Sequence, residues 1–202
     1  MNSTARNTRE ILLKTATNLF YQKGYADTSI RDIGAKAGIS NSIVYHYFKN
    51  KEELLFEIVK ESSQNLLETL KVVEKEHSDP VECLKEMLKA HTIRFSFGRK
   101  REARLLQYER YWLRGRRREA IDKDQRGVYD LYKHKLRQIS DSGLLNEIDL
   151  TVLDFSILAV ANGFYDWYKE GGRLSEEEVV ENILRFVLNA VLRKKWKADA
   201  SH

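Results

Sequence analysis

The chain has 202 residues, of which 42% are hydrophobic, and its 35 basic and 30 acidic residues give a net charge of +5. This length is sufficient for one large or two small domains with hydrophobic cores. No stretch is long and apolar enough to span a membrane, and the N-terminus lacks the apolar core of a signal peptide. The single cysteine, Cys83, excludes an internal disulfide framework and fits a reducing compartment. We therefore expect a cytoplasmic protein without a membrane partner.

The spacing of apolar residues predicts the fold class. They recur three and four positions apart, while one proline and 10 glycines argue against a sheet-rich or loop-rich protein. We predict an all-α fold of about nine helices. The first is expected from about residue 8 to residue 23 and ends at Gly24, because glycine readily adopts the conformation that terminates a helix.

Residues 28–51, TSIRDIGAKAGISNSIVYHYFKNK, predict two short helices joined by a tight turn. Ser29 and Ser40 stand at helix N-cap positions, and Gly38 between them can adopt the positive φ of a sharp turn. Four residues of the second short helix are expected to face inward: Ile43, Val44, Tyr47 and Phe48. The four expected to point outward are polar or aromatic and none is acidic: Asn41, Ser42, Tyr45 and His46.

This pattern is typical of a helix-turn-helix whose second helix enters a DNA major groove. The charge distribution supports it, because residues 1–51 contain eight basic and three acidic residues and so carry the whole net charge of +5. Phosphate neutralisation supplies much of the affinity of DNA-binding proteins. A solvated basic face would explain the count, but not its coincidence with the turn motif.

The segment from Arg9 to Lys51 resembles the N-terminal domain of TetR/AcrR-type bacterial transcriptional repressors, through ILLKTATNLFYQKGYADTSIRDIGAKAGIS and VYHYFKNKEELL. The resemblance implies a three-helix DNA-binding domain over residues 1–51 and a helical effector-binding and dimerisation domain over residues 52–202. It also implies a double-stranded DNA operator as partner. The expected DNA contacts are Thr28, Arg31, Ser40, Asn41, Ser42, Tyr45, His46 and Lys51.

These contacts are expected for different reasons. Arg31 and Tyr45 match contact positions of the family, although a solvated arginine is the alternative for Arg31. Asn41 and Ser42 open the second short helix, where side chains reach base edges, but Ser40 and Ser42 could serve only as caps. Lys51, and by the same reasoning Thr28, begins a helix, where the N-terminus favours a phosphate.

Beyond residue 51 the pattern stays helical. A long helix is expected from Lys51 to about Glu76, ended by the break at residues 77–80. Further helices are expected over residues 81–97, 101–112, 119–142 and 150–169. After Gly171 and Gly172, Ser175 is expected to cap a last helix with an acidic first turn and a basic last turn.

The last two expected helices carry small and apolar residues that fit a helix–helix interface between two subunits. An intramolecular core is the alternative. The resemblance favours a homodimer, because TetR-type proteins dimerise through their last two helices. The expected dimerisation residues are Ala159, Gly163, Ile183, Phe186, Val187 and Ala190.

Residues 94–118 contain ten basic and two acidic residues, interleaved with aromatic side chains. Aromatic walls rimmed by arginines fit an apolar, anionic ligand, whereas a solvated basic face with an aromatic core stripe is the alternative. The segment 162–192 resembles the TetR branch that senses acyl-CoA thioesters, which implies an acyl-CoA or similar anion as effector. The expected ligand-binding residues are Arg94, Phe95, Arg104, Tyr108, Tyr111 and Trp112.

Other classes of function find less support. The five histidines are scattered, Cys83 stands alone, and no glycine-rich phosphate loop is present, so we expect no enzyme activity, metal site or cofactor. A multidrug-type repressor that senses hydrophobic compounds, and a helical interaction module without a small ligand, remain the alternatives. The sequence does not distinguish a repressor from an activator.

Overall fold

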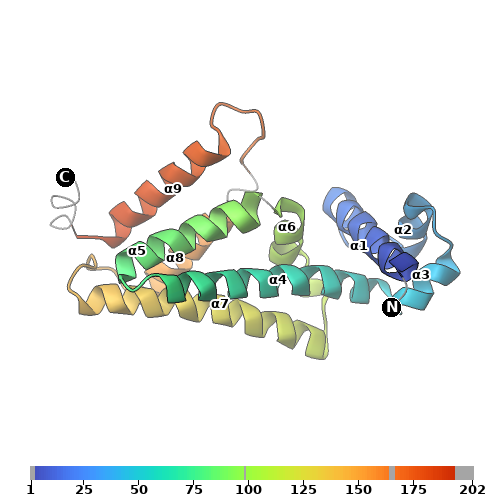
Figure 1. The fold of residues 1–202 in the computed structure, drawn as a ribbon, viewed down its shortest axis with the longest axis horizontal. Helices are drawn as coiled ribbons and strands as arrows, with labels where there is room; N and C mark the ends of the chain where they lie inside the picture. The colour runs from blue at the N-terminus through green and yellow to red at the C-terminus, as the bar shows by residue number, and fades with distance from the viewer. Residues whose placement is uncertain (1–2, 98, 164–166, 194–202) are drawn as a thin grey trace. The chain divides into compact units, whose positions relative to one another are not determined.

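The computed structural model describes residues 3–97, 99–163 and 167–193, and over these ranges it contains nine α-helices and one isolated bridge between Leu145 and Leu192 (Figure 1). The side chains of residues 3–5 and 94–96 lie outside the description. The all-α prediction is confirmed. Within the described ranges, no helix has the length and apolar character to cross a membrane. The chain forms two compact units: unit 1 comprises residues 1–64 and 99–123, and unit 2 comprises residues 65–98 and 124–202.

Unit 1 contains α1 (Ser3–Lys23), α2 (Ile30–Ala37), α3 (Asn41–Tyr47) and the first part of α4 (Lys51–Glu76). Residues 99–123 add α6 (Lys100–Tyr108), the 3-10 helix η2 (Arg110–Trp112) and the start of α7 (Gly115–Asp141). Both segments share one core, whose members include Leu12, Phe20, Ile33, Val44, Phe48, Leu54, Leu55, Leu105, Leu113 and Ile121.

The turn between α2 and α3 follows from local sequence. Ser29 accepts a hydrogen bond from the Asp32 N–H, and Asp32 in turn accepts one from the Ser29 N–H, which forms a capping box at the start of α2. Gly38 ends α2 with φ 69°, in the left-handed region that favours glycine. Ser40 caps α3 by accepting from the Ile43 N–H. These three predictions are confirmed.

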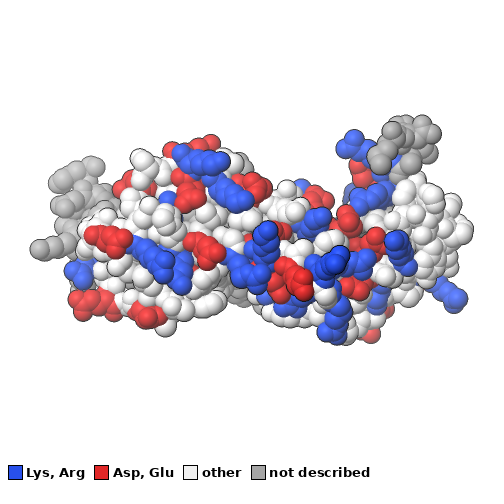
Figure 2. Space-filling view, turned by 90° about the horizontal axis from the view of Figure 1, so that it is seen from below, with Lys and Arg blue, Asp and Glu red and all other residues white. Residues whose placement is uncertain are grey.

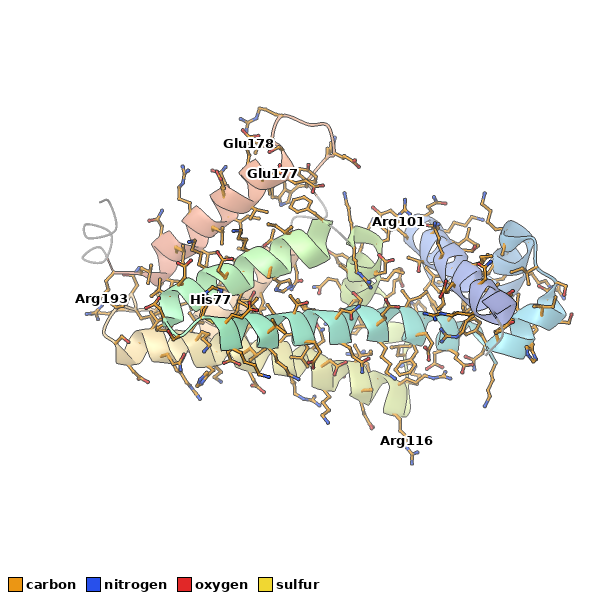
Figure 3. The ribbon with its side chains drawn as sticks, viewed as in Figure 1. His77, Arg101, Arg116, Glu177, Glu178 and Arg193 are labelled. Carbon is orange, nitrogen blue, oxygen red and sulfur yellow. The ribbon has the colours of Figure 1, made fainter. Side chains whose placement is uncertain are left out.

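Unit 2 contains the rest of α4 and α7, together with α5 (Pro80–Ala90), the π-helix η1 (His91–Phe97), α8 (Leu150–Gly163) and α9 (Glu176–Val191). Ser175 and Glu178 form a second capping box at the start of α9, beside the acidic first turn that Figure 3 labels at Glu177 and Glu178. The core residues of this unit include Leu84, Leu88, Tyr132, Leu136, Ile139, Ile157, Val187 and Val191.

Some predicted bounds were wrong. The helix expected over residues 81–97 is α-helical only to Ala90 and continues as the π-helix η1. The helix expected over residues 150–169 is described as far as Gly163, and no described residue from 167 to 174 is helical. Apolar periodicity did not mark this boundary. The functional boundary predicted after residue 51 stays a prediction, whereas packing divides α4 after residue 64.

Candidate nucleic-acid interface

Helix α3 is fixed by its buried side and presents the opposite side to solvent. Val44 and Phe48 lie in the core of unit 1, with exposed fractions of 0% and 1%. The side chains that sequence reasoning placed outward are exposed: Asn41, Ser42, Tyr45 and His46. The Tyr45 ring is 56% exposed. The exposed face of α3 is therefore available for a partner.

Ile43 corrects the sequence analysis, which expected it to face inward. It is 45% exposed on the same helix, next to the polar side chains. An apolar group at this position can contact the methyl group of a thymine in the major groove. Tyr47 is half-buried, and its ring packs edge-on against His46 with centroids 5.2 Å apart. The face thus combines polar donors and acceptors with one apolar contact.

A groove of about 560 Å³ lies beside α3 in unit 1. Its lining comes from the loop after α1, the start of α2, the end of α3 and the start of α4: Ala26, Asp27, Thr28, Ser29, Ile30, Arg31, Tyr45, Lys49, Asn50 and Lys51. Three of these residues are basic and one is acidic, and the N-termini of α2 and α4 both open here. Helix N-termini and basic side chains together favour an anion such as a DNA phosphate.

Lys51 links the start of α4 to the loop that follows α1. Its Nζ donates hydrogen bonds to the carbonyls of Tyr25 (2.7 Å) and Ala26 (3.1 Å), and it lies 4.3 Å from the centroid of the Tyr25 ring. Burial lowers the pKa of Lys51, against the opposing effect of the Asp27 and Glu109 carboxylates. An ammonium group has three donors, so one donor is left for a phosphate after both carbonyls are satisfied.

Thr28 corrects the expectation of a phosphate contact. Its side chain is 1% exposed, and its hydroxyl donates to the carbonyls of Gly24 (2.8 Å) and Leu19 (3.4 Å). The residue therefore closes the end of α1 instead of facing a partner. Arg31 and Ser40 are exposed, but Ser40 also caps α3 and its hydroxyl lies 2.9 Å from that of Ser42.

Residues 99–123 bring a second basic segment into unit 1, which the sequence analysis had treated as part of the effector domain. They contain ten basic and four acidic residues, so unit 1 as a whole carries 19 basic and 11 acidic residues, a net charge of +8. Unit 2 carries 16 basic and 19 acidic residues, a net charge of −3. On the face shown in Figure 2, basic and acidic side chains are interspersed.

Several charges of this segment are paired with the first segment of unit 1. Arg101 donates to Asn18 (2.6 Å), Arg99 forms an ion pair with Glu61 (2.9 Å), and Arg117 lies 3.6 Å from Glu52. Others are exposed; Arg116 projects away from the start of α7 (Figure 3). The ion pairs thus position the segment, while the remaining arginines give unit 1 its excess positive charge.

Four of the residues expected to bind the ligand lie in unit 1: Arg104, Tyr108, Tyr111 and Trp112. Arg104 stacks 5.2 Å from the Tyr21 ring, and the exposed Tyr111 ring lies 4.6 Å from the guanidinium groups of both Arg110 and Arg118. Trp112 packs on Tyr25 with centroids 5.5 Å apart. Tyr108 is also exposed. The side chains of the other two predicted residues, Arg94 and Phe95, lie outside the described ones.

The expected dimerisation residues differ in how exposed they are. Ile183 and Val187 are buried in unit 2, which matches the intramolecular alternative for these two positions. Ala159 and Phe186 are exposed, and Gly163 and Ala190 are half-buried. The sequence analysis missed two large apolar residues of α8, Val152 and Phe155, which are 59% and 58% exposed. Their spacing with Ala159 places all three on the outer side of α8.

Two family models match the chain, one at its N-terminal end and one over most of the remainder. The family model described as bacterial regulatory proteins, tetR family, matches residues 12–58, and the model described as tetracyclin repressor-like, C-terminal domain, matches residues 77–191. The HTH-type transcriptional repressor KstR2 of Mycolicibacterium smegmatis is 25% identical over 203 residues, which is 95% of this chain and 94% of the relative.

Two solved structures are similar over nearly the whole chain. The crystal structure of AibR in complex with isovaleryl coenzyme A and operator DNA superposes with a TM-score of 0.81 and 29% identity, over 89% of this chain and 97% of that one. A TetR/AcrR-family transcriptional regulator from Thermobifida fusca superposes with a TM-score of 0.70 and 33% identity, over 93% of this chain and 100% of that one.

Proposed function

Because the chain belongs to the TetR family of bacterial regulatory proteins, we propose that it is a homodimeric transcriptional repressor, which leaves a palindromic DNA operator when a small amphipathic effector binds. We propose no catalytic activity for the chain. A DNA operator as partner is consistent with the cytoplasmic location that the sequence favours.

The observation that supports DNA binding most strongly is the exposed face of α3. Asn41, Tyr45 and His46 project from a helix anchored by Val44 and Phe48, with Ile43 exposed beside them. Base edges are read by such a combination of polar and apolar side chains. The groove with Arg31, Lys49 and Lys51 supplies the adjoining phosphate contacts.

The DNA-binding proposal is tested by selection from a pool of random duplexes with the full-length protein. We expect enrichment of one palindromic sequence, with half-sites about one helical turn or more apart. Asn41→Ala should weaken binding and relax the base preference, whereas Arg31→Ala should weaken binding to all sequences alike. A pool without an enriched sequence would contradict the proposal.

A homodimer is supported by the exposed apolar side chains of α8 and α9. Val152, Phe155 and Phe186 are each more than half exposed in a single chain. Burial of large apolar side chains is the main favourable term in stable association. Two recognition helices held by such a dimer would read the two halves of a palindrome. We therefore assign the outer sides of α8 and α9 to the interface between two copies of the chain.

The proposed effector is an acyl-CoA or a similar amphipathic anion. AibR was solved with isovaleryl coenzyme A, and the arginines of residues 99–118 offer this chain groups for the phosphates of such a ligand. Arg104, Tyr108, Tyr111 and Trp112 stay the proposed contacts, together with Arg94 and Phe95. A sensor of hydrophobic compounds is the second candidate, favoured by the exposed rings of these aromatic residues.

A thermal-shift series separates these candidates. CoA thioesters of several chain lengths, free fatty acids and hydrophobic cations are compared on the full-length dimer. Stabilisation by CoA thioesters, lost in Arg104→Ala, would support the acyl-CoA effector. Stabilisation by hydrophobic cations alone would favour the second candidate, and no response to any class would favour a helical interaction module.

A further inference from the structure

The interior of unit 2 contains a polar cluster within an otherwise apolar core. Its members come from three helical elements: His91 begins η1, Tyr132 lies on α7, and Asp154 lies on α8. All three are at most 1% exposed. Asn162 joins them from the end of α8. A π-helix such as η1 is rare and frequently occurs at functional sites.

The hydrogen bonds of His91 fix the donors in this cluster. Its Nε2 lies 3.3 Å from the Asn162 amide oxygen, and its Nδ1 lies 3.2 Å from the Tyr132 hydroxyl oxygen. Because the amide oxygen can only accept, Nε2 carries the proton and Nδ1 accepts the hydrogen of Tyr132. Burial lowers the pKa of His91 to about 4, so the ring is neutral at pH 7. The cluster therefore contains no imidazolium cation at that pH.

Asp154 is the member without a partner. The residue is 0% exposed, and neither carboxylate oxygen has a hydrogen-bond partner among the residues that the structure describes. The Tyr132 hydrogen is directed to His91 and is not available to it. An unsatisfied buried carboxylate opposes folding, so such a group is normally paired.

The neighbouring charges do not compensate Asp154. Burial raises the pKa of Asp154 to about 6, and Asp130 acts in the same direction, while Lys133 opposes them. The ammonium group of Lys133 donates to the Tyr129 hydroxyl at 3.3 Å and lies 5.2 Å from its ring. At pH 7.5 the carboxylate is thus mostly ionised and lacks a hydrogen-bonded cation.

A second copy of the chain would not cover this group. On α8, Asp154 lies on the same side as the buried residues Ile157 and Ala161, whereas Val152 and Phe155 lie on the exposed side. A group that hydrogen-bonds to Asp154 would therefore lie in the interior of unit 2.

We propose that Asp154 forms the polar end of an effector subsite inside unit 2, where it accepts a hydrogen bond from a hydroxyl or ammonium group of the effector. The inference rests on the effector response proposed above and narrows the chemical class of the effector. A negatively charged group is excluded from this end, because it would face an unpaired carboxylate. The anionic part of an amphipathic effector must bind elsewhere.

Eight-carbon probes that differ only in their polar group test this subsite. Octylamine, 1-octanol and octanoate are titrated calorimetrically into the full-length protein and into Asp154→Asn and Asp154→Ala. Asp141→Asn, an exposed position at the end of α7, is the matched control. Thermal melting checks that each variant is folded.

We expect the wild type to bind octylamine or 1-octanol at least about tenfold more tightly than octanoate, since a satisfied buried hydrogen bond is typically worth that factor. If the effector carries an ammonium group, Asp154→Asn should lower the affinity for octylamine about tenfold or more. If the effector carries a hydroxyl group, Asp154→Asn should change the affinity for 1-octanol by no more than about threefold, because the amide oxygen still accepts a hydrogen bond. Asp154→Ala should then abolish the binding of 1-octanol. Asp141→Asn should change neither affinity.

Equal binding of all three probes, unchanged affinities in both Asp154 variants, or binding of none of the probes would overturn the inference. Binding of each variant to the selected DNA duplex is measured in parallel. Failure to select any duplex would count against the proposed function alone, because the probe affinities are measured without DNA.

Discussion

Gly34 is the position where two physical effects predict opposite outcomes. It lies within α2, and alanine there is intrinsically more favourable for a helix by about 1 kcal/mol. However, a Cβ at Gly34 would lie 2.8 Å from the Ile39 carbonyl oxygen and 3.0 Å from the Asn41 Oδ1. The Ile39 oxygen cannot move away easily, because the Ile39 N–H donates to the Gly34 carbonyl at 2.9 Å. The turn and α2 are therefore tied together at the crowded point.

We expect the steric effect to dominate in Gly34→Ala. Inserting an extra carbon into a close-packed region costs about 1–3 kcal/mol, so the net loss of stability is up to about 2 kcal/mol after the gain of about 1 kcal/mol in helix propensity. For a chain of this length, that loss corresponds to a decrease in Tm of up to about 8 °C. DNA affinity should also fall, because Asn41 must shift at the start of the recognition helix.

Thermal melting and DNA titration check both parts of this prediction. Gly38→Asn is the matched control, because nothing lies within 4 Å of a Cβ there and asparagine tolerates its φ of 69° better than most residues. The control should lose little DNA affinity. If Gly34→Ala is instead more stable than the wild type and binds DNA equally well, helix propensity decides and the steric reasoning is refuted.

Three further predictions concern unit 2. Asp154→Asn should be more stable than the wild type at pH 7.5 but not at pH 4. The pKa of this carboxyl is raised in the folded protein, so the wild type loses stability as the pH rises from 3.8 to about 6. Urea unfolding at both pH values checks this prediction. The lowered pKa of His91 has the opposite effect: the wild type should lose stability as the pH falls from 6.5 towards about 4. His91→Gln should lose less stability over the same pH range, as measured by urea unfolding. Phe186→Arg should dissociate the dimer, as measured by light scattering, whereas the exposed control Arg185→Ala should not.

Local signals in the sequence were sufficient for the helix caps and the turn within residues 28–51. Caps and turn residues act within a few positions, so Ser29, Gly38 and Ser40 could be assigned from their neighbours alone. The bounds of α4 were predicted correctly for the same reason. Ile43 was misplaced because α3 is a helix of 7 residues, too short for apolar periodicity to determine its orientation.

Long-range packing could not be predicted in this way. The basic segment at residues 99–123 joins the core of unit 1 through Leu105, Leu113 and Ile121, about 50 residues or more beyond the rest of that core. Asp154 gave no signal either, since one charged residue in the apolar helix α8 fits a buried or an exposed position equally well. The burial of Thr28 depends on its hydrogen bonds to the carbonyls of Leu19 and Gly24, whose directions the sequence does not reveal.

The most direct test of the central claim is the affinity of the full-length protein for its selected duplex and for a scrambled duplex, at several salt concentrations. We predict that the selected duplex is bound at least about 10³-fold more tightly, that affinity falls steeply with salt, and that Asn41→Ala removes most of the preference. Equal affinity for both duplexes at every salt concentration would contradict the assignment of α3 as a recognition helix.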